Sequence, residues 1–331
     1  MEIKIEPHVL FIRVTENCNA GCFMCGFGKS KKQLYMSVET MREVAAQAKK
    51  TGIKVVRFTG GEPLLHQELT TFMKIIKEQD MKISIITNGY LLPIRLEEVV
   101  AAGLDQLITS LDGVNATLHD KLRNLSGAYH GVVSSIKKIK SLYPNIVVRV
   151  NTVVSPYNFE TLEEMLELLV SLGVDQWSII PLKSQDNLWN DINRAKILSI
   201  YKHFQERVSN LDKPKLLGYS SQWAGRNDEE VEKYLTTGVT FTPKTKCSLV
   251  DYVRFYIPFT NRLLPCNCVP WRVKNADFNT DCGITALNDG GLSPFVEYLR
   301  ENGPEICLGC EPLNAYFGEH PGIIKDDVFA I

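Results

Sequence analysis

The chain has 331 residues, of which 44% are hydrophobic and 23% are charged, and its formal net charge is -1. These proportions are typical of a soluble globular protein with a sizeable core. A net charge near zero gives no overall field that would attract nucleic acid. We therefore expect no nucleic-acid partner. No apolar stretch approaches the roughly 20 residues needed to span a bilayer, so we also expect no membrane partner.

The first six residues alternate in charge and lack the apolar core of a signal peptide. We therefore expect a cytoplasmic protein. In a reducing compartment the nine cysteines are expected to be metal ligands or catalytic groups and not disulfides.

The first 182 residues predict repeated strand–helix units. Strands are expected at residues 9–14, 53–58, 83–87, 104–110, 146–150 and 177–180. Helical spacing predicts helices from about residue 38, around 69–76, and over 93–102, 132–142 and 162–172. Gly52, Gly103 and Gly173 stand at three helix-to-strand junctions, where a left-handed cap is expected. Such alternation predicts a parallel sheet, either doubly wound or a partial barrel, with its chemistry at the carboxyl ends of the strands.

Two motifs follow the first two expected strands. Cys18, Cys22 and Cys25 form a CxxxCxxC triplet, and residues 59–63 read Thr-Gly-Gly-Glu-Pro. Three thiolates can hold a [4Fe–4S] cluster while one iron stays open to a substrate or cofactor. Zinc is the alternative, but zinc sites usually close with four ligands, and no further Cys or His lies close to the triplet. The pattern favours a reactive cluster.

A second cysteine group follows a connecting, partly helical segment at residues 183–246. A hairpin expected over residues 252–264 brings Cys247 and Cys266 together, and the CxxC pair Cys307 and Cys310 completes a closed four-thiolate site. Zinc fits this spacing equally well. Cys268 and Cys282 are left over, either as small buried side chains or as a reactive thiol near the active site.

The triplet, the Gly-Gly-Glu-Pro run and the six units together resemble the radical S-adenosylmethionine (SAM) enzymes, over roughly residues 8–182. The resemblance implies an α/β fold, a partial (β/α)6 TIM-like barrel. It also implies reductive cleavage of SAM at the open iron, giving a 5′-deoxyadenosyl radical that removes a hydrogen atom from the substrate. A flavodoxin- or ferredoxin-type reductant is expected as a partner.

The same resemblance assigns roles to individual residues. Cys18, Cys22 and Cys25 are expected to bind the cluster. The residues expected to contact SAM are Met24 at the adenine, Gly60, Gly61 and Glu62 at the amino group, Asn88 at the ribose, and Ser110. Arg149 is expected to pair with the SAM carboxylate, although an internal salt bridge is an equal alternative. His119 and Arg123 either line the site or lie at the surface.

The tail, residues 247–331, resembles the twitch extension, a shortened SPASM domain that holds one auxiliary [4Fe–4S] cluster. The resemblance implies Cys247, Cys266, Cys307 and Cys310 as its ligands. No cysteine follows Cys310, so a second auxiliary cluster is not expected.

The first cysteine comes only ten residues after His8, which leaves no room for a peptide-binding extension and favours a small-molecule substrate. The overall likeness is to sugar- and nucleoside-antibiotic enzymes, in particular the branch similar to cytosylglucuronate decarboxylase. We therefore expect decarboxylation of a nucleoside uronic acid, with Arg254, Lys183 or Arg272 as a carboxylate clamp.

Other functions are also consistent with the sequence. A dehydrogenase of an aminocyclitol would pass an electron to the auxiliary cluster, and an epimerase would use Cys268 or Cys282 as the hydrogen-atom donor. A peptide-modifying enzyme is a further alternative. An iron–sulfur electron carrier or a zinc-stabilised binding module is disfavoured, because an open iron gives a carrier no advantage.

Overall fold

A computed structural model describes residues 7–27, 33–182, 199–200, 203, 206–207, 210–217, 253–264 and 283–289. Within these residues the chain forms one nine-stranded sheet with the strand order β7-β6-β5-β4-β3-β2-β1-β8-β9. The strands are β1 (Val9–Thr15), β2 (Val55–Gly60), β3 (Lys82–Thr87), β4 (Gln106–Ser110), β5 (Val147–Val154), β6 (Gln176–Pro181), β7 (Lys215–Leu217), β8 (Val253–Ile257) and β9 (Arg262–Leu264). All neighbouring strands are parallel except β8 and β9.

Helices connect the first six strands. They are α1 (Val38–Thr51), α2 (Leu69–Lys77), α3 (Leu92–Ala101), α4 (Ala116–Arg123), α5 (Ala128–Leu142) and α6 (Leu162–Ser171), and the short α12 (Ala286–Asp289) packs on α1. Single 3₁₀ turns lie at Pro63–Leu65, Phe159–Thr161 and Pro258–Thr260. The six expected strands are all present, and Gly52, Gly103 and Gly173 adopt the expected positive φ. The helix expected over residues 132–142 begins earlier, at Ala128, and α4 is not among the helices for which bounds were expected.

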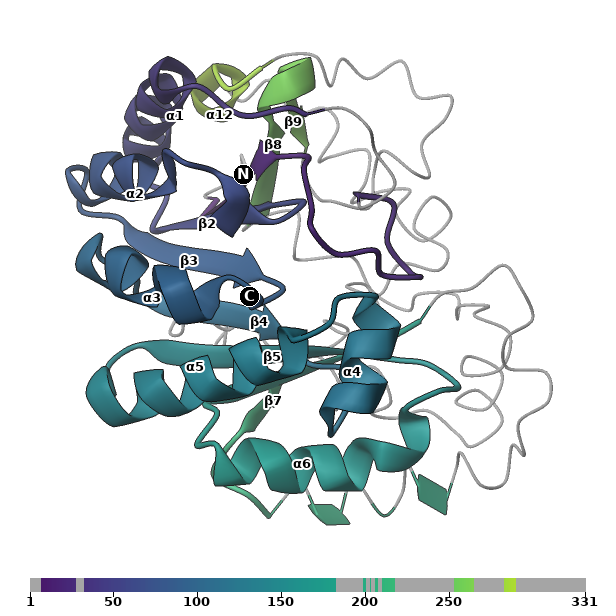
Figure 1. Cartoon of the computed structure of the whole chain (residues 1–331). Helices are drawn as coiled ribbons and strands as arrows, with labels where there is room; N and C mark the ends of the chain where they lie inside the picture. The colour runs from purple at the N-terminus through teal and green to yellow at the C-terminus, as the bar shows by residue number, and fades with distance from the viewer. Residues whose placement is uncertain are drawn as a thin grey trace, which may run out of the picture.

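The strand order decides between the two expected architectures. Strands β1 to β6 follow one another across the sheet without a reversal, whereas a doubly wound sheet reverses direction near its middle. Right-handed crossovers that always step the same way place their helices on one face. Figure 1 shows α1, α2, α3, α5 and α6 along one side of the sheet. The fold is therefore of the partial-barrel type, as expected.

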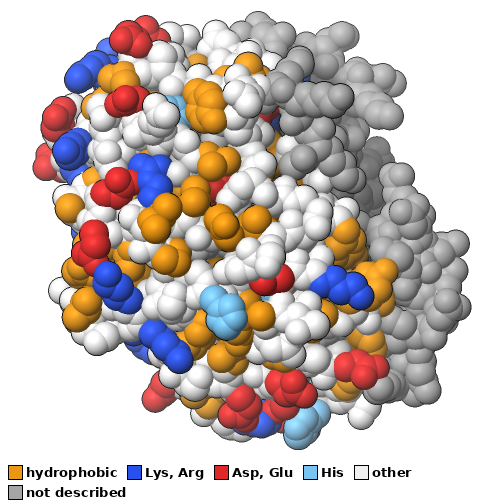
Figure 2. All heavy atoms as spheres, viewed as in Figure 1, with side chains coloured by type: hydrophobic (Ala, Val, Ile, Leu, Met, Phe, Trp, Pro, Cys, Tyr) orange, Lys and Arg blue, Asp and Glu red, His pale blue; other side chains and the backbone are white. Residues whose placement is uncertain are grey.

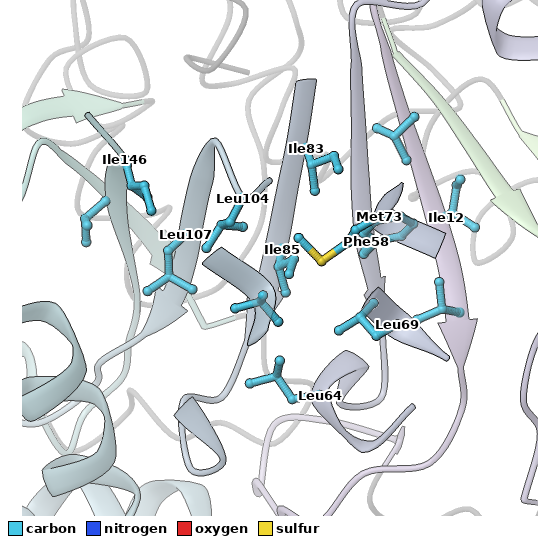
Figure 3. Packing of buried hydrophobic residues seen from close by; sticks show 14 of the residues in the cluster. Ile12, Phe58, Leu64, Leu69, Met73, Ile83, Ile85, Leu104, Leu107 and Ile146 are labelled. Carbon is cyan, nitrogen blue, oxygen red and sulfur yellow. The ribbon is translucent and has the colours of Figure 1, made fainter. Parts of the chain in front are cut away.

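The hydrophobic core lies between the sheet and these helices. Alternate residues of each strand supply it, such as Leu10, Ile12 and Val14 of β1, because successive side chains point to opposite faces. Figure 3 shows Ile12, Phe58 and Ile85 from three strands close to Leu69 and Met73 of α2. We call this side of the sheet the outer face.

The other side, the inner face, carries polar groups among its apolar ones. Arg57 of β2 donates to Ser84 Oγ at 3.1 Å and to Gln106 Oε1 at 3.0 Å, and Gln106 donates to Gln176 Oε1 at 3.0 Å. The guanidinium of Arg57 also lies 4.9 Å from the centre of the Phe11 ring. Because buried polar groups require partners, this chain of hydrogen bonds links β2, β3, β4 and β6 across the inner face.

The expected hairpin is present as β8 and β9, with Asn261 at positive φ in its turn. The sequence did not indicate its location: β8 pairs in parallel with β1, so the hairpin extends the main sheet. Strand β7, within the segment expected to be a connection, extends the opposite edge.

None of the helices in the described residues is long and apolar enough to cross a membrane. On the face seen in Figure 2, positive and negative side chains are interspersed over the described part.

Candidate functional site

The cysteine triplet lies in the loop that leaves the carboxyl end of β1. All three side chains are free thiols, with Cys22 buried and Cys18 and Cys25 half-buried. The backbone N–H of Cys25 donates to Cys22 O at 3.1 Å, and the N–H of Ala20 points to Cys18 Sγ at 3.5 Å. The loop is therefore folded on itself, with an amide directed at one of the sulfur atoms. Met24, between the last two cysteines, is half-buried.

The glycines that follow β2 hold this loop by close backbone contact. A Cβ added to Gly60 would lie 2.1 Å from Thr15 O, and one added to Gly61 would lie 2.0 Å from Asn17 O. Their neighbours make the matching hydrogen bonds: Gly61 N–H donates to Thr15 O at 2.9 Å, and Glu62 N–H to Asn17 O at 2.7 Å. Only glycine allows so close an approach. The Gly-Gly pair therefore fixes the start of the cysteine loop.

Glu62 is fully buried and its carboxylate is occupied by protein donors. Its Oε1 accepts from Leu64 N–H at 3.0 Å and Thr87 Oγ1 at 2.7 Å, and its Oε2 accepts from Asn88 N–H at 2.7 Å. Burial raises the pKa of Glu62 to about 7, against the effect of these hydrogen bonds. The carboxylate joins the ends of β2 and β3.

Asn88 connects that junction to the cysteines. Its side-chain amide donates to Asn19 Oδ1 at 2.7 Å and lies 3.9 Å from Cys18 Sγ. Its own Oδ1 accepts from Tyr90 N–H at 3.0 Å, which fixes the amide's orientation. Asn88 therefore contacts the loop that carries the cluster ligands.

A basic side chain of α4 reaches Cys22. Arg123 Nη1 lies 3.9 Å from Cys22 Sγ, and Nη2 lies 2.7 Å from the buried Asp112 Oδ2. Burial raises the pKa of Cys22, and the Arg123 charge opposes that rise. Burial also raises the pKa of Cys18, to about 11. Arg123 and the fully buried His119 thus belong to the interior and not to the surface, which settles an open question.

Polar residues gather on the inner face of β4, β5 and β6, beside the end of β4. The register aligns Ser110 with Asn151 and Asn151 with Ser178. Arg149, two residues before Asn151 on the same face, donates through Nε to Asn151 Oδ1 at 3.0 Å. Ser110 and Arg149 therefore each lie beside Asn151, Ser110 by strand register and Arg149 by its hydrogen bond.

Arg13, a residue that the sequence reasoning missed, lies on the inner face near the end of β1. Its guanidinium is 4.8 Å from the Phe27 ring centre and 5.6 Å from that of Phe255, and Nη1 is 3.3 Å from Glu16 Oε1. Burial lowers its pKa, while Glu16 and Cys25 favour its charged form. Alternation along the strand could have identified it: Arg13 lies between the core residues Ile12 and Val14, so its side chain is expected on the opposite face of the sheet.

Arg254 does not join these residues. The register pairs Arg254 with Leu10, so it lies on the outer face, near the amino end of β8. It is buried and donates through Nη1 to Val253 O at 2.7 Å. This position, away from the carboxyl strand ends, does not favour the expected carboxylate clamp. The other expected residues of the second half lie outside the described residues: Lys183, Cys247, Cys266, Cys268, Arg272, Cys282, Cys307 and Cys310.

The cysteine loop suits a [4Fe–4S] cluster. Among the described residues no three His, Cys, Asp or Glu side chains converge on a single metal ion. A cluster needs a different arrangement, since each thiolate binds a different iron. N–H groups of Ala20, Asn88 and Arg123 face two of the three sulfur atoms. Such donors are usual around cluster sulfurs and influence their potential.

Comparison with known proteins agrees with this geometry. Residues 12–169 match the Radical SAM superfamily, a stretch that contains the triplet, the Gly-Gly-Glu motif, the end of β1 and all of β2 to β5. The match covers 158 of the 331 residues, so this part of the chain is similar to radical SAM enzymes, a class that uses a [4Fe–4S] cluster and SAM.

Two curated relatives share a name. A protein named "Probable GTP 3′,8-cyclase" from Methanocaldococcus jannaschii is 33% identical over 187 residues, covering 54% of this chain and 61% of the relative. One of the same name from Saccharolobus solfataricus is 33% identical over 175 residues, covering 52% and 56%. The chain therefore spans less than two thirds of these relatives.

Solved structures of low identity share the fold. Streptococcus suis SuiB bound to S-adenosylmethionine has a TM-score of 0.64 at 15% identity, covering 98% of this chain and 75% of SuiB. The structure of anSMEcpe with bound AdoMet has a TM-score of 0.63 at 15% identity, covering 98% and 87%. At such identity the likeness concerns the fold alone.

Proposed function

We propose that this chain cleaves SAM reductively and removes a hydrogen atom from a small nucleoside-derived substrate. The observation that carries the proposal is the cysteine loop itself, fixed by Gly60 and Gly61, with side-chain donors directed at Cys18 and Cys22. When bound, the cluster and SAM supply an electron and the 5′-deoxyadenosyl radical.

The chain's own residues position these groups. Cys18, Cys22 and Cys25 would hold three irons. Ser110 ends β4 beside Asn151, and the Arg149 side chain donates to Asn151 Oδ1, so Ser110 and Arg149 would bind the carboxylate of SAM. Gln106 and Gln176 of the Arg57 hydrogen-bond chain begin β4 and β6, so this chain lies at the opposite end of β4 from Ser110.

Glu62 takes an indirect part in this proposal. Its carboxylate is occupied by Leu64, Thr87 and Asn88. We propose that the motif meets the SAM amino group through its backbone, while the Glu62 side chain holds β2 and β3 at the correct spacing.

An anionic substrate group is supported by the basic inner face. Arg13 near the end of β1 and Arg149 within β5 both belong to that face, with aromatic rings beside Arg13. Phosphate and carboxylate groups suit such guanidinium donors. Two substrates of the nucleoside class meet this condition: a nucleoside uronic acid, which would lose CO₂, and a nucleoside triphosphate, towards which the relatives' name points. Both lose a hydrogen atom from the sugar.

For the tail, residues 247–331, the functions of the cysteines are predictions from the sequence. An auxiliary [4Fe–4S] cluster on Cys247, Cys266, Cys307 and Cys310 would accept an electron in a dehydrogenase. Cys268 or Cys282 would serve as a hydrogen-atom donor in an epimerase. Replacing either with Ala should stop an epimerase after hydrogen abstraction and leave a decarboxylase unaffected.

The test is anaerobic SAM cleavage by the reconstituted, dithionite-reduced full chain. We expect 5′-deoxyadenosine from wild type and none above background from the Cys18→Ala/Cys22→Ala/Cys25→Ala variant. GTP and cytosylglucuronate are the first substrates to add, followed by an aminocyclitol and a peptide. With sugar-deuterated substrate, deuterium should appear in the 5′-deoxyadenosine. Equal amounts of 5′-deoxyadenosine from wild type and the triple variant would contradict the proposal. Deuterium transfer from the peptide alone would show that the substrate is a peptide and not a nucleoside.

A further inference from the structure

The carboxyl end of α4 abuts the cysteine loop. A Cβ added to Gly21 would lie 2.6 Å from Asn124 Nδ2, so the residue before Cys22 packs directly on the residue that follows α4. Asn124 ends the helix with a positive φ, and its N–H donates back to Asp120 and Lys121 carbonyls. The last helical residue, Arg123, is thereby held beside Cys22.

Arg123 makes two directed contacts with its guanidinium. Nη2 is 2.7 Å from Asp112 Oδ2, and Nη1 is 3.9 Å from Cys22 Sγ. The guanidinium is planar and presents its N–H groups in a fixed fork, so fixing one side orients the other. The Asp112 carboxylate is fully buried and the Arg123 side chain is 12% exposed, so solvent screens the pair weakly.

Asp112 is itself fixed by three elements. Its Oδ1 accepts from Val153 N–H at 2.8 Å, and its carbonyl accepts from Asn158 Nδ2 at 2.8 Å. Its own N–H donates to His119 Nδ1 at 3.0 Å, which ties it to α4. The position of the guanidinium is thus set by β5, the turn after it and α4 together.

We propose that Arg123 is a positioning residue for Cys22, where it holds a fixed positive charge beside a cluster ligand and raises the cluster's reduction potential. The inference rests on the proposed function, because it needs a cluster on the triplet. Reduction adds a negative charge to the cluster, and a nearby cation stabilises the reduced state more than the oxidised one. Net charge and hydrogen bonds to sulfur are known determinants of cluster potential.

Asp112 has the opposite electrostatic effect in this arrangement. Its carboxylate places Arg123 but also puts a buried negative charge in the same neighbourhood. Removal of the Asp112 charge should therefore move the potential in the opposite direction from removal of the Arg123 charge. A role that is only structural would not produce two shifts of opposite sign.

The experiment is a redox titration of the reconstituted full chain, followed by electron paramagnetic resonance. The reporter is the reduced-cluster signal that the Cys18→Ala/Cys22→Ala/Cys25→Ala variant lacks, so any auxiliary cluster does not interfere. We expect a more negative midpoint potential in Arg123→Gln and a potential closer to wild type in Arg123→Lys. The matched control is Lys121→Gln, which removes an exposed charge from the same helix and should leave the potential unchanged.

Asp112→Asn keeps the side-chain shape and should shift the potential towards more positive values. If Arg123→Gln fails to take up iron, the sign of the potential shift in Asp112→Asn tests the inference instead. An unchanged potential in Arg123→Gln with full iron content, or a negative shift in Asp112→Asn, would overturn the inference. Absence of the reporter signal from wild type would instead contradict the proposed function, so the two failures are distinguishable.

Discussion

The two faces of the sheet are built from the same strands but differ in composition. The outer face contributes Leu10, Ile12 and Phe58 to one continuous apolar core under the helices. The inner face alternates with it and carries Arg13, Arg57, Arg149 and Gln106. Because the outer face already supplies the burial that stabilises the sheet, the inner face and the strand-end loops are free to carry polar groups at a cost in stability.

This comparison predicts that stability and function respond to different faces. Phe58→Ala on the outer face removes a fully buried ring and should lower the free energy of unfolding by about 3–5 kcal/mol. Arg149→Lys on the inner face loses the hydrogen bond to Asn151 and should cost about 0.5–1.5 kcal/mol. Denaturant unfolding of both variants measures the difference, and Arg149→Lys should also raise the KM for SAM. Equal losses of stability in the two variants would show that the outer face does not contribute more to stability than the inner face.

A second prediction concerns the loop contact. Gly61→Ala places a methyl group 2.0 Å from Asn17 O, so the cysteine loop must move and most of the iron at the triplet should be lost. Gly26→Ala is the matched control, because nothing lies within 4 Å of a Cβ added there. Iron per chain after reconstitution measures both, with circular dichroism as the check on folding. Full iron content in folded Gly61→Ala would contradict the contact's role.

Glu62→Gln tests the buried carboxylate. Gln can keep one acceptor oxygen, but its amide would face the Asn88 N–H that now donates to Oε2. One unsatisfied buried donor should cost about 1–3 kcal/mol. Thermal and denaturant unfolding measure this loss, and a variant as stable as wild type would show that the carboxylate's hydrogen bonds do not hold β2 and β3 together.

The smallest expected effect is a pH dependence that arises from His119. Burial lowers the pKa of His119 to about 3, from an ordinary value of 6.5, with Arg123 adding to the shift. Between these values the unfolded chain binds a proton that the folded chain does not, so stability should fall as the pH drops below 6.5. His119→Asn keeps an acceptor for Asp112 N–H and removes the titration.

We expect the loss of stability between pH 7.5 and 5.5 to be smaller in His119→Asn by about 1 kcal/mol. Denaturant unfolding of both proteins at the two pH values gives the comparison. Parallel pH dependence in wild type and variant would show that His119 is not responsible.

Local pattern predicted most of the barrel, because its signals are short-range. Apolar strands, helical spacing and the junction residues Gly52, Gly103 and Gly173 all depend on near neighbours in sequence. Pairing of β8 with β1 was not predictable in this way, since it joins residues more than 240 positions apart. In α4 the polar residue His119 takes a buried position, which a pattern of apolar residues does not indicate.

The candidate site shows the same division. Spacing identified the cysteine triplet and the Gly-Gly-Glu run, but it did not show what lies against the glycines. The structure places the cysteine-loop backbone there. Arg123 was noticed in the sequence, but its partners Asp112 and Cys22 come from separate elements, and only the fold brings them together.

The most direct test of the three-cysteine site is iron, labile sulfide and zinc per chain after anaerobic reconstitution, in wild type and in the Cys18→Ala/Cys22→Ala/Cys25→Ala variant. Loss of about four irons in the variant would establish a [4Fe–4S] cluster on the triplet. About four irons remaining in the variant would indicate an auxiliary [4Fe–4S] cluster on the second cysteine group. Zinc retained in the variant would indicate a zinc site there instead. Equal iron in the two proteins, or zinc alone in wild type, would contradict the account.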